Sequence, residues 1–319
     1  MQRFKNILLV DDADAGNQAA LDRAVTLAKK NEAQLTVVRV VDQWPLQAHQ
    51  FTEAMSLSDV HEFVVQAGRD QLEKLLAPVQ QGGVRAGAKV LSGTPFLEII
   101  REVLREKHDL VIMTAEGDEG LKARLFGSTS LHLMRKCPCP VWVMKPTHGK
   151  RFARILAAVD TDPDESDEEH DALNTKIMDL ATSLAEREQG ELHIVHAWTM
   201  FGESLLRSKR ARLNEEQVDA WVLQERQRHE SELDRLLGKY TFDDLSHEVH
   251  LVKGKATTLI PELANKKQID LIVMGTVCRT GVAGFFIGNT AESVLQQVDC
   301  SVLTVKPEGF VSPVKPEGT

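Results

Sequence analysis

The chain contains the same unit twice. Residues 107–146 align without a gap with residues 268–307, at a shift of 161 positions, and 10 of the 40 aligned residues are identical. The identities include an Asp-Leu pair, two glycines and a closing Lys-Pro. A repeat of this length restricts the chain to folds that place two similar units together.

Each half also begins with the same pattern. FKNILLVDDAD at residues 4–14 matches FARILAAVDTD at residues 152–162. Both are short runs rich in Val, Ile and Leu, followed by a polar turn, as is typical of a parallel strand buried on both faces. We therefore expect a first domain at 1–146, a linker at 147–151, a second domain at 152–307 and a C-terminal tail at 308–319.

Strand and helix patterns alternate within each half. The predicted strands lie at 5–11, 34–41, 84–91, 109–114 and 140–145, and again at 154–159, 190–197, 247–253, 269–274 and 301–306. The first half has helical patterns at 16–31, 58–77, 95–106 and 127–136, and the second has a long one at 214–240, where Asn214 and Gln217 resemble a capping pair. This alternation predicts the α/β class: two tandem doubly wound domains, each a five-stranded parallel sheet with helices on both faces.

Composition and charge argue against several classes of protein. The formal charge of −9 and 42% hydrophobic content describe an acidic globular protein, for which we expect no direct nucleic-acid binding. No run approaches the roughly 18 apolar residues of a membrane span. The opening MQRFKNILLV lacks the apolar core of a secretory signal, and the four cysteines give no disulfide framework, so the sequence predicts a cytoplasmic protein.

The repeated first-strand Asp, the glycine-rich loop after the fourth strand and the Lys-Pro close make residues 4–307 resemble the universal stress protein family in its tandem-domain, E-type form. Nucleotide-binding members hold ATP with the pattern G-x2-G-x9-G-S/T. The second half matches with Gly275, has Cys278 in place of the second glycine, and continues with Gly288 and Asn289. The first half has Thr114, Gly117, Gly127 and Ser128.

The resemblance implies that the second half is the better nucleotide site, with ATP or another adenine nucleotide as ligand, with or without Mg²⁺. Its predicted contacts are Val159, Asp160, Ala197, Gly254, Gly275, Gly288, Asn289 and Thr290. A degenerate equivalent in the first half comprises Asp12, Gly93, Gly117, Gly127, Ser128 and Thr129. The alternative is that these glycines only make tight turns. Pro95 after Gly93-Thr94 has the structural explanation of a first helical position.

Other patterns favour structural roles. Asp160, Asp162 and Asp164 alternate like calcium ligands, but Glu165 stands where an EF-hand loop requires glycine, so we expect a solvated loop. Cys137 and Cys139 are expected to be small buried residues, and they would lie on opposite faces if the segment is extended. His193 and His196 are expected to share one face of their strand.

No arrangement of nucleophile, base or metal ligands predicts catalysis. The resemblance therefore implies a non-enzymatic stress-response or survival factor, or at most a slow ATPase, built as an intramolecular pseudo-dimer; a homodimer stays open. Two alternatives remain: a binding module for an apolar or acyl-bearing ligand beside Trp198 and Phe201, and an interaction scaffold with an empty cleft.

Overall fold

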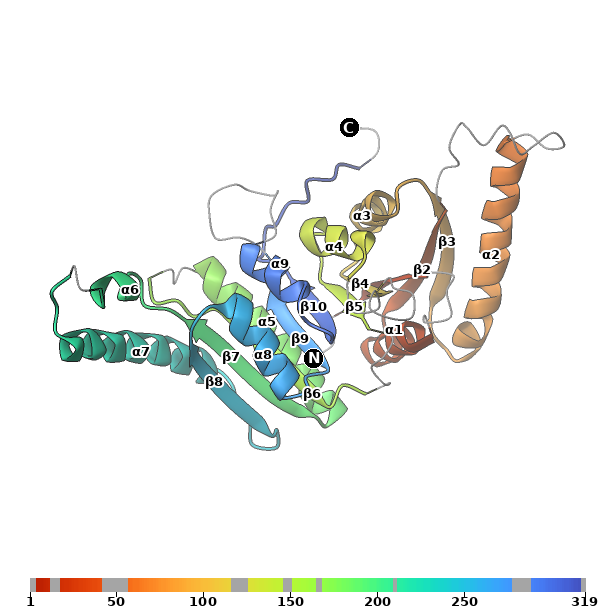
Figure 1. The fold of residues 1–319 in the computed structure, drawn as a ribbon. Helices are drawn as coiled ribbons and strands as arrows, with labels where there is room; N and C mark the ends of the chain where they lie inside the picture. The colour runs from red at the N-terminus through yellow and green to blue at the C-terminus, as the bar shows by residue number, and fades with distance from the viewer. Residues whose placement is uncertain are drawn as a thin grey trace.

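The structure is a computed structural model of the chain, and it describes residues 4–11, 18–41, 57–115, 126–145, 151–164, 168–208, 211–276 and 288–316. In the first half, strands and helices alternate in the predicted order (Figure 1). The elements are β1 (Asn6–Val10), α1 (Gln18–Asn31), β2 (Gln34–Val41), α2 (Leu57–Gln81), β3 (Ala86–Ser92), α3 (Pro95–Glu106), β4 (Leu110–Thr114), α4 (Ser128–Lys136) and β5 (Val141–Met144).

The second half repeats this order and adds one short helix, α6. Its elements are β6 (Arg154–Ala158), α5 (Glu168–Glu188), β7 (Glu191–Trp198), α6 (Glu203–Leu206), α7 (Glu215–Leu237), β8 (His247–Lys253), α8 (Ala256–Lys266), β9 (Leu271–Gly275), α9 (Asn289–Leu295) and β10 (Ser301–Val305). The predicted strands are confirmed to within about two residues at each end, the usual uncertainty of such boundaries.

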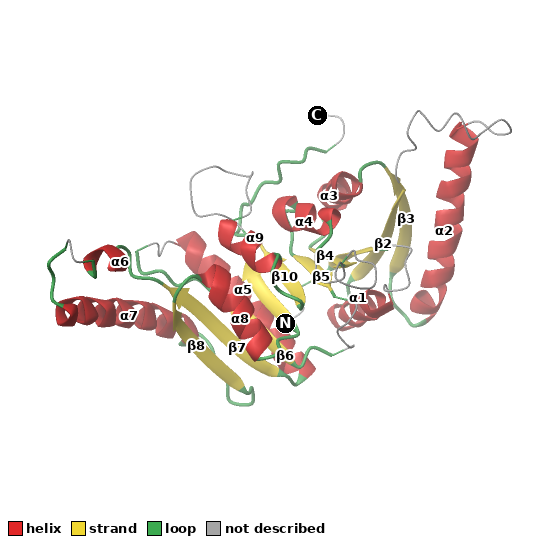
Figure 2. Cartoon of the chain, in the orientation of Figure 1, coloured by secondary structure: helices red, strands yellow, loops and turns green. Residues whose placement is uncertain are grey.

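The two halves join through their last strands into one sheet. The strand order is β3-β2-β1-β4-β5-β10-β9-β6-β7-β8, and Figure 2 shows the strands running through the middle of the molecule. Pairing is parallel within each half, and β5 and β10 pair antiparallel, with Trp142 opposite Leu303. The expected pair of five-stranded parallel sheets in a pseudo-dimer is therefore confirmed.

Helices cover both faces of this sheet. One apolar layer lies between the sheet and α1, α2, α5 and α7, and the other lies between the sheet and α3, α4, α8 and α9. Alternate residues of each strand point into the two layers: on β7, Ile194 enters the first and Val195 the second. Because both layers run across the β5–β10 joint, the halves share a continuous core.

The long helices α2 and α7 lie at opposite ends of the molecule (Figure 1). The predicted capping pair of α7 is confirmed, because the Asn214 side chain accepts from the Glu216 N–H and Gln217 Oε1 accepts from the Asn214 N–H. Val218, Leu233 and Leu236 of α7 are buried, whereas Trp221 is 41% exposed. Leu233 and Leu236 belong to the apolar layer between α7 and the sheet.

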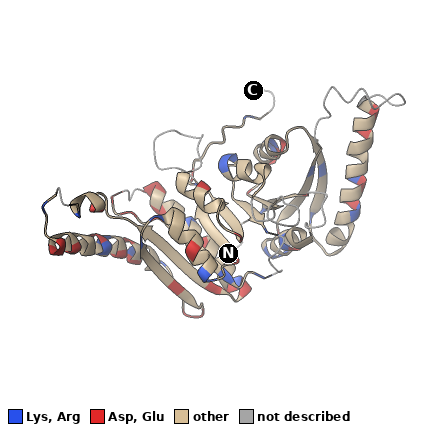
Figure 3. Ribbon diagram, viewed as in Figure 1, with Lys and Arg blue, Asp and Glu red and all other residues tan. Residues whose placement is uncertain are grey.

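Charged residues of both signs are interspersed along α2 and α7 (Figure 3). None of the helices in the described part of the chain is both long and apolar enough to cross a membrane.

Candidate functional site

Some of the predicted site residues of the second half lie where the strand order reverses, whereas Ala197 and Gly254 lie on β7 and after the edge strand β8. From β6 the chain moves outward to β7 and β8, and it then returns to place β9 and β10 on the other side of β6. Ligands of open parallel sheets bind outside the carboxyl ends of the strands at such a point. Val159 and Asp160 directly follow β6, and Gly275 ends the neighbouring β9.

The segment after β6 is held by hydrogen bonds on two sides. The Val159 N–H donates to the Val195 carbonyl at 3.0 Å. The Asp160 N–H donates to Asn174 Oδ1 at 2.9 Å, and Asn174 Nδ2 donates back to the Asp160 carbonyl at 2.6 Å. Asn174 lies on α5 and is 3% exposed. Sequence reasoning missed Asn174, because its role depends on contact between elements and leaves no local pattern.

His196 of β7 and His229 of α7 form a buried pair next to the segment that follows β6. His196 Nε2 is 2.9 Å from His229 Nδ1 on α7, and His196 Nδ1 is 3.3 Å from the Thr161 nitrogen and 3.4 Å from the Val159 carbonyl. Burial, and to a smaller extent His229, lower the pKa of His196 to about 4, so its ring is neutral at pH 7. The sequence offered no signal for His229, which is one polar residue among many on its helix.

The expectation that His193 and His196 share a face is wrong. Residues three apart on a strand point to opposite faces, because successive side chains alternate. His196 contacts His229 on the α7 side, whereas His193 contacts His250 on the adjacent β8.

The glycine-rich loop after β9 is described only at its ends. The Gly288 N–H donates to the Thr276 carbonyl at 3.0 Å, which returns the chain to the end of β9 before α9 begins. Gly288 is the N-cap of α9 with φ −60°, and Asn289 and Thr290 are exposed in its first turn. Cys278 lies outside the described residues.

Gly275 has a packing explanation. A Cβ built on this glycine would lie 3.1 Å from Leu173 Cδ2 of α5. The absent side chain therefore lets α5 approach β9, whether or not a phosphate binds nearby.

Gly93 and Gly254 occupy matching turns after β3 and β8. Both have φ +141°, and a Cβ would lie 3.0 Å from Glu98 Cγ or 2.9 Å from Leu259 Cδ1. Backbone geometry therefore requires glycine at both places. Pro95 does begin α3. Ala197 is half-buried on β7, which continues one residue further, to Trp198.

The equivalent residues of the first half are partly described. Gly127 is the N-cap of α4, and Ser128 and Thr129 form its first turn. Asp12 and Gly117 lie outside the described residues. In this half the residue corresponding to His196 is Arg39, which forms an ion pair with the buried Asp11.

The repeated Lys-Pro also contributes a buried cation that sequence reasoning did not interpret. Lys306 Nζ donates to the Met134 and Arg135 carbonyls at 2.7 and 3.1 Å, at the end of α4 in the other half. Burial lowers the pKa of Lys306 to about 7. The same position in the first half is Lys145, which lies 4.3 Å from the Phe126 ring centroid.

Cys137 and Cys139 are buried as expected. The turn between them brings their sulfur atoms to 3.6 Å, so they do not lie on opposite faces.

The two aromatic residues considered for an apolar cleft differ in exposure. Trp198 is 4% exposed and stacks on His229, so little of it is available to line a cleft, whereas Phe201 is 99% exposed. Asp164 is paired with Arg228 of α7.

Three comparisons agree on what this chain is similar to. The model of the universal stress protein family matches residues 3–145 and again residues 151–306. Proteins named universal stress protein E from Salmonella typhi and Escherichia coli K12 are each 29% identical to it, over 99% of this chain and 98% of theirs.

Solved structures are also similar over nearly the whole chain. A functionally unknown protein from Pseudomonas aeruginosa PAO1 has a TM-score of 0.71 and 26% identity, over 97% of this chain and 95% of that one. A protein from Archaeoglobus fulgidus shares the fold, with a TM-score of 0.62 at 19% identity, over 94% of this chain and 98% of that one.

Proposed function

The chain belongs to the universal stress protein family, which gives it a role in the stress response, and from this premise we propose that it acts by binding an adenine nucleotide in its second half. The proposed site lies between the carboxyl ends of β6 and β9. The protein would then be a cytoplasmic, nucleotide-responsive survival factor without a dedicated catalytic site.

The observation that supports this proposal most is convergence at the reversal point. Val159 and Asp160 from β6, Gly275 from β9, and Gly288 to Thr290 from α9 come from distant parts of the chain, and hydrogen bonds hold two of these segments in place. In the proposal, Asp160 contacts the ribose or base, and the segment from Gly288 to Thr290 contacts the phosphates. The nucleotide binds with or without Mg²⁺.

The first half supports at most weaker binding. Thr114 has a side chain where Gly275 has none, and the Arg39–Asp11 ion pair lies at the equivalent strand ends. We therefore propose one nucleotide per chain.

The histidine pair argues against a catalytic base at this edge. His196 is 1% exposed, and both of its ring nitrogens lie near polar partners of the protein. A general base must reach the proton that it removes. We propose a binding function for this edge, with hydrolysis absent or slow.

The test is calorimetric titration of Mg-ATP into the wild type and into Gly288→Asp. Because Gly288 has φ −60° and Asp is a good N-cap, this variant keeps the helix start while placing a negative charge where phosphate is proposed to lie. We expect one ATP per wild-type chain and at least tenfold weaker binding in Gly288→Asp, the equivalent of about 1.4 kcal/mol.

Gly127→Asp at the N-cap of α4 is the matched control, and it is expected to leave the affinity unchanged. Equal ATP affinity in wild type and Gly288→Asp, or no binding in the wild type, contradicts the proposal.

A pocket elsewhere favours the second candidate function, the binding of an apolar or acyl-bearing ligand. It has a volume of about 530 Å³ and lies between the two halves. Phe4, Leu104 and Leu180 give it apolar walls. Lys107 and Lys176 place cations at it, and the Asp109 carboxyl, which also lines it, accepts from the Lys5 and Asn6 N–H groups. Such a lining suits a fatty acid or similar anion. Native mass spectrometry of the purified chain would reveal a co-purified acyl compound in this case.

A further inference from the structure

We propose that His193, Glu248 and His250 form a zinc site between β7 and β8. His193 Nδ1 lies 3.1 Å from His250 Nε2 and 3.6 Å from a carboxylate oxygen of Glu248. Each of the three residues offers one ligand atom, and these atoms all lie within 4.8 Å of one another. Parallel register places His193 directly opposite Glu248, with His250 on the same face two residues along β8.

These separations suit a single tetrahedral zinc ion. With Zn–N bonds of about 2.0–2.1 Å, two ligand atoms of a tetrahedron are about 3.3 Å apart. The observed 3.1 and 3.6 Å lie on either side of that value. Two imidazoles and a carboxylate are a ligand set that zinc accepts, with water in the fourth position, whereas magnesium and calcium prefer oxygen ligands alone.

The two imidazoles can each offer a ligand atom. A neutral imidazole binds a metal through a nitrogen lone pair, and each ring has one nitrogen in the cluster. The ring nitrogens that face each other share one proton in a hydrogen bond. Zinc binding requires only that the donor ring move its proton to its other nitrogen.

A second carboxylate lies beside the other ring nitrogen of His193. His193 Nε2 is buried without a hydrogen-bond partner and lies 3.6 Å from Glu191 Oε2. His193 itself is 1% exposed. An imidazole that binds zinc through one nitrogen commonly donates its other N–H to a carboxylate, which orients the ring. Glu191 is the positioning residue for His193 in this arrangement.

Charged groups of both signs surround the rings. Lys267 Nζ contacts Glu248 Oε2 at 2.5 Å. An ionised carboxylate has two oxygens and about four acceptor positions, so it can hold Lys267 and a metal together. Glu191 and Glu248 place two carboxylates beside the rings, and the cations near them are Lys267, Lys266 and Arg154.

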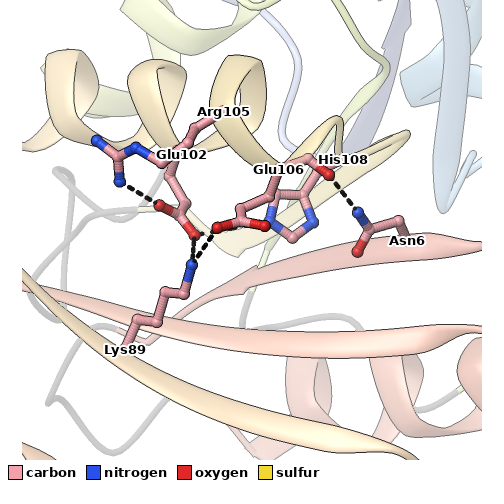
Figure 4. A network of polar contacts seen from close by, with 6 residues as sticks. All are labelled: Asn6, Lys89, Glu102, Arg105, Glu106 and His108. Carbon is pink, nitrogen blue, oxygen red and sulfur yellow. Dashed lines mark hydrogen bonds and ion pairs between the residues drawn. The ribbon is translucent and has the colours of Figure 1, made fainter. Parts of the chain in front are cut away.

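The first half has a different cation at the corresponding place. The residue equivalent to His250 is Lys89, and its ammonium group contacts Glu102 and Glu106 of α3 at 2.6 and 2.7 Å (Figure 4). The equivalent of Glu106 is Lys267, so the charge on the covering helix is reversed. In the second half the strand carries an imidazole in place of the ammonium group, and Lys267 pairs with Glu248 of the strand. The imidazole nitrogens are the metal ligands that the first half lacks at this place.

This site is separate from the proposed nucleotide site. His193 lies five residues before Trp198 at the carboxyl end of β7, about 17 Å along the strand at 3.3 Å per residue. It also lies on the opposite face of the sheet from His196. Zinc binding and nucleotide binding can therefore succeed or fail independently.

The test is titration of ZnCl₂ into the full chain after treatment with EDTA, followed by calorimetry. Cobalt(II) serves as a second probe, because its d–d absorption reports tetrahedral nitrogen and oxygen ligation. We expect one zinc per wild-type chain, at least tenfold weaker binding in Glu248→Gln and in His250→Gln, and about tenfold weaker binding in Glu191→Gln. Glu248 is 43% exposed, so Glu248→Gln is expected to fold.

His247→Gln is the matched control, because His247 lies on the same strand but outside the cluster. It should bind zinc as the wild type does. Zinc should also raise the unfolding temperature of wild type and His247→Gln, and not that of His250→Gln.

The proposal is overturned if the wild type binds no zinc. It is also overturned if Glu248→Gln and His250→Gln bind zinc as tightly as His247→Gln, which would place the ion at other residues such as the Cys137–Cys139 turn.

Discussion

The two halves have the same backbone at the ends of their first two strands but fill it with different side chains. The Asp11 N–H donates to the Val38 carbonyl at 2.7 Å, and the Val159 N–H makes the equivalent bond to Val195 at 3.0 Å. Beside them, Arg39 Nε donates to Asp11 Oδ2 at 2.9 Å in the first half. The second half has the neutral His196 against the Val159 carbonyl.

The helices α2 and α7, which pack on these strands, also present different side chains in the two halves. Gln71 of α2 accepts a hydrogen bond from Arg39, and His229 of α7 contacts His196. The first half thus stabilises this position with a permanently charged guanidinium, and the second with an imidazole that is neutral at pH 7 and titrates near pH 4. The repeated fold places a polar side chain at the same position in each half. The first half pairs it with a carboxylate, and the second half pairs it with another histidine and a backbone carbonyl.

The largest expected difference is in the cost of removing these groups. Arg39→Met removes the guanidinium that faces a buried carboxylate, and breaking such a pair costs about 3 kcal/mol of unfolding free energy. His196→Gln removes only neutral hydrogen bonds, for which we expect about 1 kcal/mol. Urea denaturation of both variants measures the two losses. Equal losses of unfolding free energy in the two variants would show that the Arg39–Asp11 ion pair stabilises the fold no more than the hydrogen bonds of His196.

The second prediction concerns pH. The pKa of His196 is lowered to about 4 in the folded chain, against 6.5 for an unperturbed histidine. Between these values the unfolded chain binds the proton and the folded chain does not, so stability falls as pH drops from about 6.5 to 4, by up to about 3 kcal/mol.

His196→Gln should reduce the slope, with the remainder due to His193 and His250, whose pKa values burial also lowers, whereas Arg39→Met should keep the whole slope. Urea denaturation at several pH values between 4 and 7 checks both. A wild-type slope that persists in His196→Gln would assign the titration to another group.

The third prediction tests where the halves should behave alike. Gly93→Ala and Gly254→Ala each place a Cβ at φ +141° and close to a neighbouring side chain, so we expect each to lose about 2 kcal/mol of stability. Thermal unfolding of the two variants measures this. A loss confined to one variant would show that the two turns are not equivalent.

The smallest expected effect is at Gly275. Ala at this position would contact the flexible end of Leu173, which can move, so we expect a loss of about 1 kcal/mol. The first half already has Thr114 in the equivalent position. If Gly275→Ala keeps both stability and ATP affinity, this glycine is needed neither for packing nor for the phosphate.

Much of the fold could be predicted because its signals are local. Apolar runs such as ILLV and ILAA identify buried strands, Asn214 and Gln217 mark a helix start, and Pro95 marks another. Each signal depends on a few consecutive residues and on the periodicity of one element. In the aligned segments each element is indicated twice, once in each copy of the repeat.

The candidate site was less predictable. Asn174, His229 and Lys306 act through residues 14 or more positions away, and nothing beside them in the sequence announces this. The failed expectation for His193 and His196 shows that even one strand requires its parity to be counted correctly.

That this chain has two similar α/β units follows from its sequence alone, because a repeat and alternating hydrophobic periods are properties of neighbouring residues. The antiparallel pairing of β5 with β10 is visible only in the folded chain, as is the register of β7 against β8 that brings His193, Glu248 and His250 together. Strand register and packing across a sheet depend on contacts between distant residues, which many sequences with the same local pattern would satisfy differently.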